Sequence, residues 1–508
     1  MAPQYLQRIL RAQVYDVAIE SPLDLAPRLS RRLGVEVFCK REDLQPVFSF
    51  KLRGAHNKLA QLSSERLQHG VICSSAGNHA QGLALAARRH GVRAVIVMPE
   101  NTASIKVEAV RALGGETLLH GQTYDEANEY ALKLAAQQGL EFVHPFADPD
   151  VIAGQGTVAV ELTRQWKEPP RAIFVPVGGG GLIAGIGAYI KQLHPQVKII
   201  GVEPVEAAGM HDSLRNGAPV TLAHVGIFAD GVAVRRVSDE TFRIAQEVVD
   251  QIVLVDTDEI CAAIKDIFED SRVIMEPAGA LAIAGLKHYL EDNGVDGGSY
   301  IAINSGANMN FDRLRHVTER AEIGEHREAL IAVKIPEQRG AFLHFCEALG
   351  AHNVTEFNYR YAASRDANLF VGISLTDGRR EAAEVIRSLQ QSGYAVLDLS
   401  DNELAKIHVR HMVGGRVPDL DDEVICRFEF PERRGALLSF LQAIGGRWNI
   451  SLFHYRNHGS DYGRVMAGVQ VPTQQRDDFR EHLDTLGYQY IFETQNPAYR
   501  LFLGSEQD

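Results

Sequence analysis

The segment at residues 71–98 reads VICSSAGNHAQGLALAARRHGVRAVIVM, and it decides the fold class of this chain. A short apolar run at Val71–Cys73 leads through a turn into an Ala-rich stretch, which we expect to be a helix ending near Gly91. The next run, Ala94–Met98, is fully apolar, as a parallel strand buried on both faces requires. A strand, a helix and a second buried strand form a βαβ unit, so the segment predicts an α/β fold.

The same alternation extends outward from this segment, from about residue 35 to residue 315. Further helices are expected at residues 106–113, 124–136 and 183–193, and further strands at 117–119, 172–175, 198–202 and 300–303. Repeated βαβ units of this kind predict a mostly parallel sheet, or two such sheets.

After about residue 320 the chain contains an internal repeat. IPEQRGAFL at residues 335–343 recurs as FPERRGALL at 430–438, and NVTEFNYR at 353–360 resembles NISLFHYR at 449–456. Each copy predicts a small βαββαβ module in which a helix opens at Arg-Gly-Ala. Two interpretations stay open, a duplicated dimerisation domain and a paired sensor of a small effector. We expect three domains, at residues 1–320, 321–415 and 416–508.

The composition of the 508 residues excludes several classes of protein. The formal net charge of −13 and the lack of a basic run argue against a nucleic-acid partner. The five cysteines are scattered and form no Cys-x-x-Cys pair, which favours a reducing compartment and gives no zinc or other metal site. Without an apolar run of about 18 residues or an N-terminal signal, we expect a cytoplasmic protein with no membrane span.

Four glycines and a leucine at residues 178–182 come directly after an expected strand and open an expected helix. Successive glycine N–H groups at a helix N-terminus form a cradle for a phosphate. The same glycines also allow a second interpretation. Gly179, Gly181 and Ala184 satisfy the dinucleotide pattern of a nicotinamide-dependent dehydrogenase, and Glu203 lies where a ribose-binding acid belongs.

Lys51 stands in an unusual setting, between Phe50 and the sequence Leu52-Arg53-Gly54-Ala55. Burial against an aromatic ring and a nearby cation would lower its pKa and free the amine to form a Schiff base. Taken alone, Lys51 also suits an ordinary surface lysine at a helix start. The dinucleotide interpretation gives it no role.

Three further turns carry polar groups at strand-to-helix junctions. SSAGNHAQG at residues 74–82 offers helix-start N–H groups and hydroxyls to a carboxylate, although Ser-x-x-Asn is also a common cap. Ser305 follows the expected strand at residues 300–303, at the sheet edge where α/β folds bind ligands. Glu276 precedes a helix start, and His79 suits a structural role.

Together these motifs resemble those of the fold-type-II pyridoxal-phosphate enzymes, which share the fold of the tryptophan synthase β chain. SFKxRGA, SAGNHAQG, GGGGL, EPAGA and SGAN resemble most closely the biosynthetic threonine dehydratases, and the repeat resembles their paired ACT-like regulatory modules. The resemblance implies pyridoxal 5′-phosphate as cofactor, with Lys51 as its Schiff-base lysine and Ser305 facing the pyridine nitrogen. The remaining residues that it implies at the cofactor are Phe50, Asn78, Gly178, Gly179, Gly180, Gly181 and Leu182. Those implied at the substrate carboxylate are Ser74, Ser75, Ala76, Gly77 and Asn78.

The resemblance also implies an activity and its regulation. L-Threonine would be converted to 2-oxobutanoate and ammonia, the first committed step of isoleucine biosynthesis, and L-serine would also be a substrate. Isoleucine would inhibit the enzyme, and valine would oppose that inhibition. Both effectors would act through the strands at residues 353–359 and 449–455, and the protein would be a homotetramer. Racemase relatives carry a serine where this chain has Ala76, which argues against racemisation. An inactive enzyme shell that serves as an amino-acid sensor stays open as an alternative.

Overall fold

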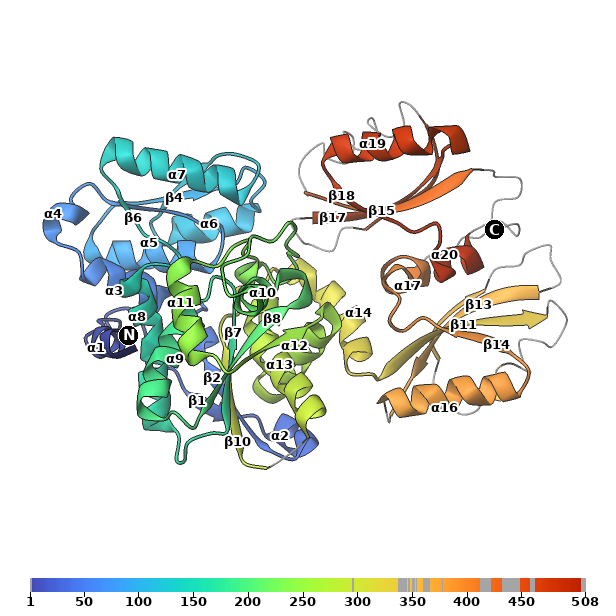
Figure 1. Ribbon diagram of the computed structural model, residues 1–508, viewed down its shortest axis with the longest axis horizontal. Helices are drawn as coiled ribbons and strands as arrows, with labels where there is room; N and C mark the ends of the chain where they lie inside the picture. Colours follow the sequence, from blue (N-terminus) through green and yellow to red (C-terminus); the bar gives the residue numbers. More distant parts are fainter. Residues whose placement is uncertain are drawn as a thin grey trace. The chain divides into compact units, whose positions relative to one another are not determined.

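The computed structural model describes residues 2–294, 297–336, 345, 348–349, 352, 354–359, 366–376, 378–411, 422–431, 448–456 and 462–503. The chain divides into two compact units, Met1–Asn310 and Phe311–Asp508. Figure 1 shows the helices and strands of both units.

The first unit contains two sheets. The larger has the order β1 (Leu23–Leu25), β2 (Glu36–Arg41), β10 (Ser299–Asn304), β7 (Ala172–Pro176), β8 (Lys198–Pro204), β9 (Gln251–Val255). All neighbouring pairs are parallel except β1 with β2. The smaller sheet is wholly parallel, in the order β5 (Glu116–Leu119), β4 (Ala94–Met98), β3 (Val71–Ser74), β6 (Glu141–Phe142). The sequence predicted either one mostly parallel sheet or two, and the first unit has two.

Helices cover both faces of the larger sheet, because its central strands are apolar on both sides. One face carries α1 (Ala2–Leu10), α8 (Pro149–Gln165), α9 (Gly181–Leu193) and α11 (Asp239–Val248). The other carries α13 (Pro277–Asn293), against which α12 (Thr257–Ser271) packs, while α2 (Pro27–Leu33) contacts β2 and α12. Ile173 and Val175 point to the first face, whereas Phe174 meets the Tyr289 ring of α13 with the ring centroids 5.5 Å apart.

The smaller sheet is covered in the same way. Its one face packs on α3 (Lys51–Ala60), α5 (Asn78–His90) and α6 (Ser104–Ala112), and the other on α7 (Tyr124–Gln138). Figure 1 shows α7 on the side of this sheet opposite to α5 and α6. The predicted helix end near Gly91 is confirmed, since α5 ends at His90 and Gly91 follows it in the left-handed conformation. Two shorter helices complete this unit, α4 (Ser64–Leu67) and α10 (Gly209–Asn216).

The second unit contains two four-stranded antiparallel sheets with equivalent strand orders. The first is β12 (Val354–Tyr359), β13 (Asp366–Ser374), β11 (Glu328–Pro336), β14 (Ala395–Asp398), with α16 (Gly378–Gln391). The second is β16 (Asn449–Arg456), β17 (Tyr462–Gln470), β15 (Glu423–Pro431), β18 (Gln489–Phe492), with α19 (Arg476–Leu486). The four strands and the second helix of the module predicted from the sequence are therefore present twice. Its expected helix starts at Arg339 and Arg434 lie outside the described residues.

The two modules share one apolar cluster. It is built on the sheet faces opposite α16 and α19 and contains Phe370 and Ile425, one residue from each module. Among its described residues, this unit also contains α14 (Leu314–Gly324), α17 (Glu403–Ile407) and α20 (Pro497–Phe502). Among all the described residues of the chain, no helix combines the length and hydropathy of a membrane span.

Candidate active site

The predicted site residues gather where parallel strands end and helices begin. Ser74 is the last residue of β3, and Asn78 is the first of α5. The glycines at residues 178–181 follow β7, and Ser305 follows β10. Carboxyl ends of parallel strands are the usual ligand-binding edge of α/β sheets.

Lys51 is the first residue of α3, and its Nζ donates a hydrogen bond to the Pro145 carbonyl at 3.3 Å. Nζ also lies 5.3 Å from the centroid of the Phe50 ring. Burial lowers the pKa of Lys51 to about 8, and the negative charge of Glu276 opposes that shift. Lys51 therefore exchanges its proton much closer to neutrality than an ordinary lysine does.

Two imidazoles near Lys51 are neutral. Burial and the charge of Lys51 lower the pKa of His79 to about 3, and its Nε2 lies 3.0 Å from the Val143 carbonyl, to which it donates. Burial lowers the pKa of His144 to about 4, and its Nδ1 accepts the Ala147 N–H at 2.9 Å. Both rings are held by backbone groups, in agreement with the structural role expected for His79.

A chain of side-chain amides lies beside Lys51. Asn78 Nδ2 donates to Glu276 Oε1 at 2.6 Å. Asn308 Nδ2 donates to Asn78 Oδ1 at 2.6 Å and to the Val47 carbonyl at 2.8 Å. The sequence pointed to the first two residues and gave no role to Asn308, although it ends the SGAN motif.

The glycine loop forms a close turn at the start of α9. Gly180 has φ +86°, and a Cβ there would lie 2.6 Å from Met210 Cε. A Cβ on Gly179 would overlap the Phe146 ring, and Thr241 Oγ1 donates to the Gly179 carbonyl at 2.7 Å. The side chain of Leu182 is buried in the core, so only its backbone N–H is available to a ligand. The first turn of α9 thus presents N–H groups of the kind that bind an anion.

Ser305 is tied to the segment that carries Lys51. It is 4% exposed, and its Oγ donates to the Ala278 carbonyl at 3.3 Å. The Phe50 N–H donates to the Ser305 carbonyl at 3.2 Å, and Ser49 pairs with Gly306 in an isolated β-bridge. Ser305 and Lys51 are therefore neighbours although 254 residues separate them in the sequence.

The turn from Ser74 to Asn78 leaves polar groups for a ligand. Ser74 is fully buried, and its Oγ has no hydrogen-bond partner within the described part of the chain. The Gly77 N–H donates to Ser75 Oγ at 3.3 Å, and Ala76 and Asn78 are partly buried. Within the same described residues, no side chain caps the start of α5, so its first N–H groups remain for an anion.

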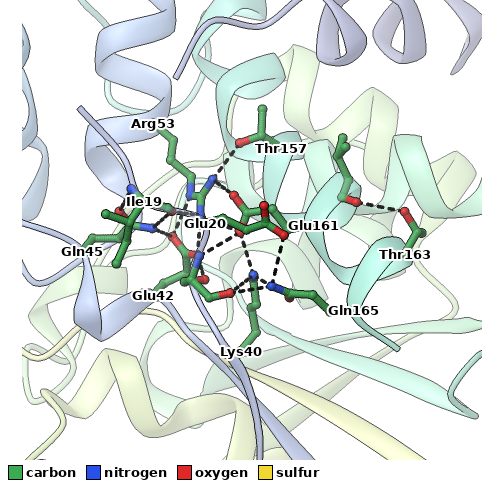
Figure 2. A network of polar contacts seen from close by, with 12 residues as sticks. Ile19, Glu20, Lys40, Glu42, Gln45, Arg53, Thr157, Glu161, Thr163 and Gln165 are labelled. Atoms are coloured by element: carbon green, nitrogen blue, oxygen red, sulfur yellow. Dashed lines mark hydrogen bonds and ion pairs between the residues drawn. The ribbon is translucent and has the colours of Figure 1, made fainter. Parts of the chain in front are cut away.

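A network of buried charges lies behind Lys51 and was not predicted (Figure 2). Arg53, two residues along α3, pairs with Glu42 Oε2 at 2.7 Å and with Glu161 Oε1 at 2.6 Å. Lys40 Nζ lies 2.6 Å from Glu161 Oε2, and all four side chains are fully buried. Burial and the nearby Arg53 were expected from the sequence to lower the pKa of Lys51 together. Burial does lower it, whereas Arg53, paired with two carboxylates, does not contribute, so that half of the expectation was wrong.

Glu203, which the dinucleotide interpretation assigned to a ribose, caps a helix in this structure. Glu203 is fully buried, and its two carboxylate oxygens accept the Met210 and His211 N–H groups at 2.8 Å. Burial raises the pKa of Glu203 to about 8, and the two backbone N–H groups oppose the shift. Because Glu203 caps the start of α10, it is not placed to bind a ribose. Among the described residues, no group of three or more His, Cys, Asp or Glu side chains could hold a metal ion.

The arrangement fits a phosphate-bearing aldehyde such as pyridoxal phosphate. An aldehyde needs an unprotonated amine with which to form a Schiff base, and the lowered pKa of Lys51 supplies one. A phosphate needs backbone N–H groups at close range, and the glycine loop, where an added Cβ would collide with its neighbours, can supply them. The unpartnered Ser74 hydroxyl and the free start of α5 suit the carboxylate of an amino-acid substrate.

Comparisons with known proteins identify the family. Residues 14–306 match the family described as pyridoxal-phosphate dependent enzyme. Residues 319–409 and 414–503 match the C-terminal regulatory domain of threonine dehydratase.

Similar proteins agree over nearly the whole length. The L-threonine dehydratase biosynthetic IlvA of Burkholderia multivorans is 54% identical over 98% of this chain and 99% of its own. The L-threonine dehydratase biosynthetic IlvA of Escherichia coli is 54% identical over 98% of this chain and 97% of its own. The solved structure of the processed form of threonine deaminase isoform 2 from Solanum lycopersicum is 54% identical, with a TM-score of 0.62 over 63% of this chain and 88% of that one. The chain therefore belongs to the biosynthetic L-threonine dehydratases, which are pyridoxal-phosphate-dependent enzymes with a C-terminal regulatory domain.

Proposed function

We propose that this chain converts L-threonine to 2-oxobutanoate and ammonia. The observation that carries the proposal is the 54% identity to biosynthetic threonine dehydratases over almost the full length, in the catalytic and regulatory parts alike. The lowered pKa of Lys51 beside a phosphate cradle supports it, because this chemistry needs an amine that is unprotonated near neutral pH.

We assign the cofactor to the residues gathered around Lys51. Lys51 Nζ would bond to the cofactor's aldehyde, and Phe50 would pack against its ring. The backbone N–H groups of Gly178–Leu182 would bind the phosphate, because the start of α9 concentrates positive dipole there. Asn78 would donate to the 3′ oxygen, and Ser305 would face the pyridine nitrogen. When bound, pyridoxal phosphate supplies an acceptor for the electron pair left at Cα.

Protein groups perform the proton transfer and the orientation of substrate. The turn from Ser74 to Asn78 binds the substrate carboxylate through hydroxyl and N–H groups. The amine of Lys51 would remove the Cα proton of the bound substrate. The hydroxyl on Cβ would leave as water, with a proton that balances the one taken from Cα, and hydrolysis of the released enamine would give 2-oxobutanoate and ammonia. The water lost by elimination is regained on hydrolysis, so the net reaction consumes none.

Two residue types direct the reaction toward elimination. Ser305 carries a neutral hydroxyl, and the proton that it donates to the Ala278 carbonyl could be donated to the pyridine nitrogen instead. That bond would leave the nitrogen largely unprotonated and disfavour transamination. Ala76 has no hydroxyl with which to return a proton to the opposite face of Cα, so racemisation is not expected. L-Serine carries the same leaving group on Cβ and is proposed as a second substrate.

The second unit is proposed to regulate the reaction, with isoleucine as inhibitor and valine as its opponent. We divide the chain at residues 1–320, 321–415 and 416–508, which assigns one effector module to each sheet of the second unit. The proposed effector strands cover 353–359 and 449–455. Residue 353 lies outside the described residues, whereas 354–359 and 449–455 lie in β12 and β16. A cytoplasmic homotetramer completes the proposal.

The test is the rate of 2-oxobutanoate formation from L-threonine, with and without L-isoleucine and with L-isoleucine plus L-valine. Turnover that isoleucine suppresses and valine restores supports both halves of the proposal. Turnover that ignores isoleucine refutes the assigned effector and keeps the chemistry. An inactive parent that is also indistinguishable from Lys51→Ala, with cofactor supplied, leaves the amino-acid sensor as the better explanation.

A further inference from the structure

We propose that Asn308 is a positioning residue that sets the orientation of the Asn78 amide and thereby holds an N–H, rather than a carbonyl oxygen, toward the cofactor's 3′ oxygen. The inference rests on the proposed placement of Asn78 at that oxygen. Asn308 has no other role in the proposed mechanism.

The direction of the hydrogen bonds follows from one group that can only accept. The Val47 carbonyl has no proton to donate, so the Asn308 atom 2.8 Å away must be the amide nitrogen. That same nitrogen lies 2.6 Å from the Asn78 amide, and the atom it meets must therefore be the acceptor Oδ1. Oxygen and nitrogen of an amide are otherwise hard to distinguish, but here the backbone carbonyl decides both amides.

The hydrogen bond between Asn78 and Glu276 requires the same orientation of the Asn78 amide. With Oδ1 facing Asn308, the Asn78 amide turns its nitrogen to Glu276 Oε1 at 2.6 Å, and a carboxylate accepts that proton. One N–H of Asn78 remains, and it has no other partner among the described residues. A flipped Asn78 would place its carbonyl against the Glu276 carboxylate and its nitrogen against another donor. Asn308 thus makes the productive orientation the favourable one.

The consequence concerns the charge on the cofactor. An N–H donated to the 3′ oxygen withdraws negative charge from it and weakens its hold on the proton shared with the Schiff-base nitrogen. Loss of that donor leaves more charge on the oxygen, so the proton is held more tightly. The pKa of the bound chromophore should then rise by about one pH unit, the size of a single charge-assisted hydrogen bond.

Other charged groups lie near Asn78 and are not substituted in these variants. Glu276 Oε1 lies 2.6 Å from Asn78 Nδ2. Asp230, which pairs with Lys106 at 2.9 Å, precedes Gly231, where an added Cβ would lie 4.0 Å from the same nitrogen. His79 and His144 have pKa values of about 3 and about 4, so they do not titrate with the chromophore near neutral pH.

The experiment titrates the visible absorption of the holoenzyme with pH in the parent and in Asn308→Asp, Asn308→Ala, Asn78→Ala and the double variant Asn78→Ala/Asn308→Ala. We expect both Asn308 variants and Asn78→Ala to raise the chromophore pKa by about one unit. The double variant should match Asn78→Ala, because Asn308 acts only through that amide. Asn293→Asp is the matched control, since Asn293 Nδ2 also donates to a backbone carbonyl, that of Tyr289 at 2.8 Å, and should leave the pKa unchanged.

Three results would overturn the inference. The first is an unchanged chromophore pKa in Asn308→Ala. The second is a rise in Asn308→Asp alone, which would show that the added charge is the cause. The third is a double variant whose shift is the sum of the two single shifts. Threonine turnover is measured separately, so an enzyme that shows the expected shifts but does not act on threonine keeps this inference and refutes the proposed substrate.

Discussion

Lys51 lies at the first position of α3, with its amine against the Pro145 carbonyl and the Phe50 ring. Burial penalises its charged form more than Glu276 stabilises it, and the pKa falls to about 8. An amine with this pKa is partly unprotonated at neutral pH, whereas a lysine in water, with a pKa of about 10.4, is almost wholly protonated. This single residue thus obtains its reactivity from where the fold places it.

The reactivity of Lys51 should follow that pKa. In protein stripped of cofactor, the rate at which pyridoxal phosphate forms its visible Schiff-base band should rise with pH and level off above about 8. The unprotonated amine is the nucleophile, so the rate follows its fraction. Stopped-flow absorbance across the pH range measures it, with Lys51→Ala as the variant that forms no band. A rate that keeps rising to about 10.4 would mean that Lys51 is an ordinary solvated lysine.

The proposed phosphate site includes Gly180, a position where the backbone conformation and the close neighbours favour glycine. Gly180→Asp adds a Cβ that would lie 2.6 Å from Met210 Cε, forces a side chain into φ +86° and puts a negative charge beside the proposed phosphate site. We expect loss of bound cofactor, measured by absorbance after dialysis. Gly34→Asp is the matched control, because Gly34 has φ +71° with open space around it and ends α2. Normal cofactor content in Gly180→Asp would contradict the phosphate assignment.

At the scale of elements, the buried charges around Arg53 join β2, α3 and α8. Two cations and two carboxylates balance, which is the condition under which charges are tolerated in an interior. Arg53 Nη2 also donates to the Ile19 carbonyl at 3.2 Å, so the N-terminal segment is fastened to the same point (Figure 2). The network thereby holds the start of α3, which carries Lys51.

Removing one charge of this network should be costly. Glu161→Gln leaves Arg53 and Lys40 buried with a single remaining carboxylate, and we expect a loss of about 3–5 kcal/mol in the free energy of unfolding. Urea denaturation followed by circular dichroism measures it. Glu116→Gln is the control, since Glu116 pairs with Arg93 on the surface, and it should change stability by less than about 1 kcal/mol. Equal losses in the two variants would show that the buried network does not stabilise the fold.

The same network should make stability depend on acid. Burial alone would raise the pKa of Glu42, but Arg53 and Lys40 outweigh it and hold the pKa below the ordinary glutamate value. The unfolded chain therefore binds this proton first as pH falls, and stability declines below about pH 4.5. Urea midpoints measured down the pH scale should show that decline in the parent and a smaller one in Glu42→Gln. Parallel declines would assign the acid sensitivity to other carboxylates.

At the scale of the whole molecule, the chain combines an α/β unit that carries the site with a unit built from a repeated module. The two sheets of the second unit share an apolar cluster that contains Phe370, which is fully buried. Packing in such a cluster couples the two modules, because a change in one alters the contacts of the other.

A variant of that cluster should separate regulation from catalysis. Phe370→Ala leaves a cavity that costs about 3–5 kcal/mol in the second unit, and we expect weaker inhibition of threonine turnover by isoleucine with basal turnover retained. The control is Phe311→Ala, because Phe311 is 77% exposed and should affect neither. Dose–response curves for isoleucine provide the measurement. A parallel loss of basal turnover in Phe370→Ala would show that the second unit is needed for catalysis itself.

Much of this protein could be predicted from local sequence. Alternating apolar runs and Ala-rich stretches indicated the βαβ units, since strand and helix periods are properties of neighbouring residues. The repeat indicated two equivalent modules, and both sheets appear with the same strand order. The motifs around Lys51, Asn78, residues 178–182 and Ser305 identified the family, which the comparisons confirmed.

Only the tertiary structure decided which groups balance one another. Glu161 stands 108 residues from Arg53, and Asn308 stands 230 residues from Asn78, so no periodicity links either pair. The pKa of Lys51 likewise depends on burial by distant segments, and Glu203 turned out to cap α10 rather than to face a ligand. Secondary structure and motif identity are set by residues close in the chain, whereas electrostatic balance and hydrogen-bond direction depend on distances that exist only after folding.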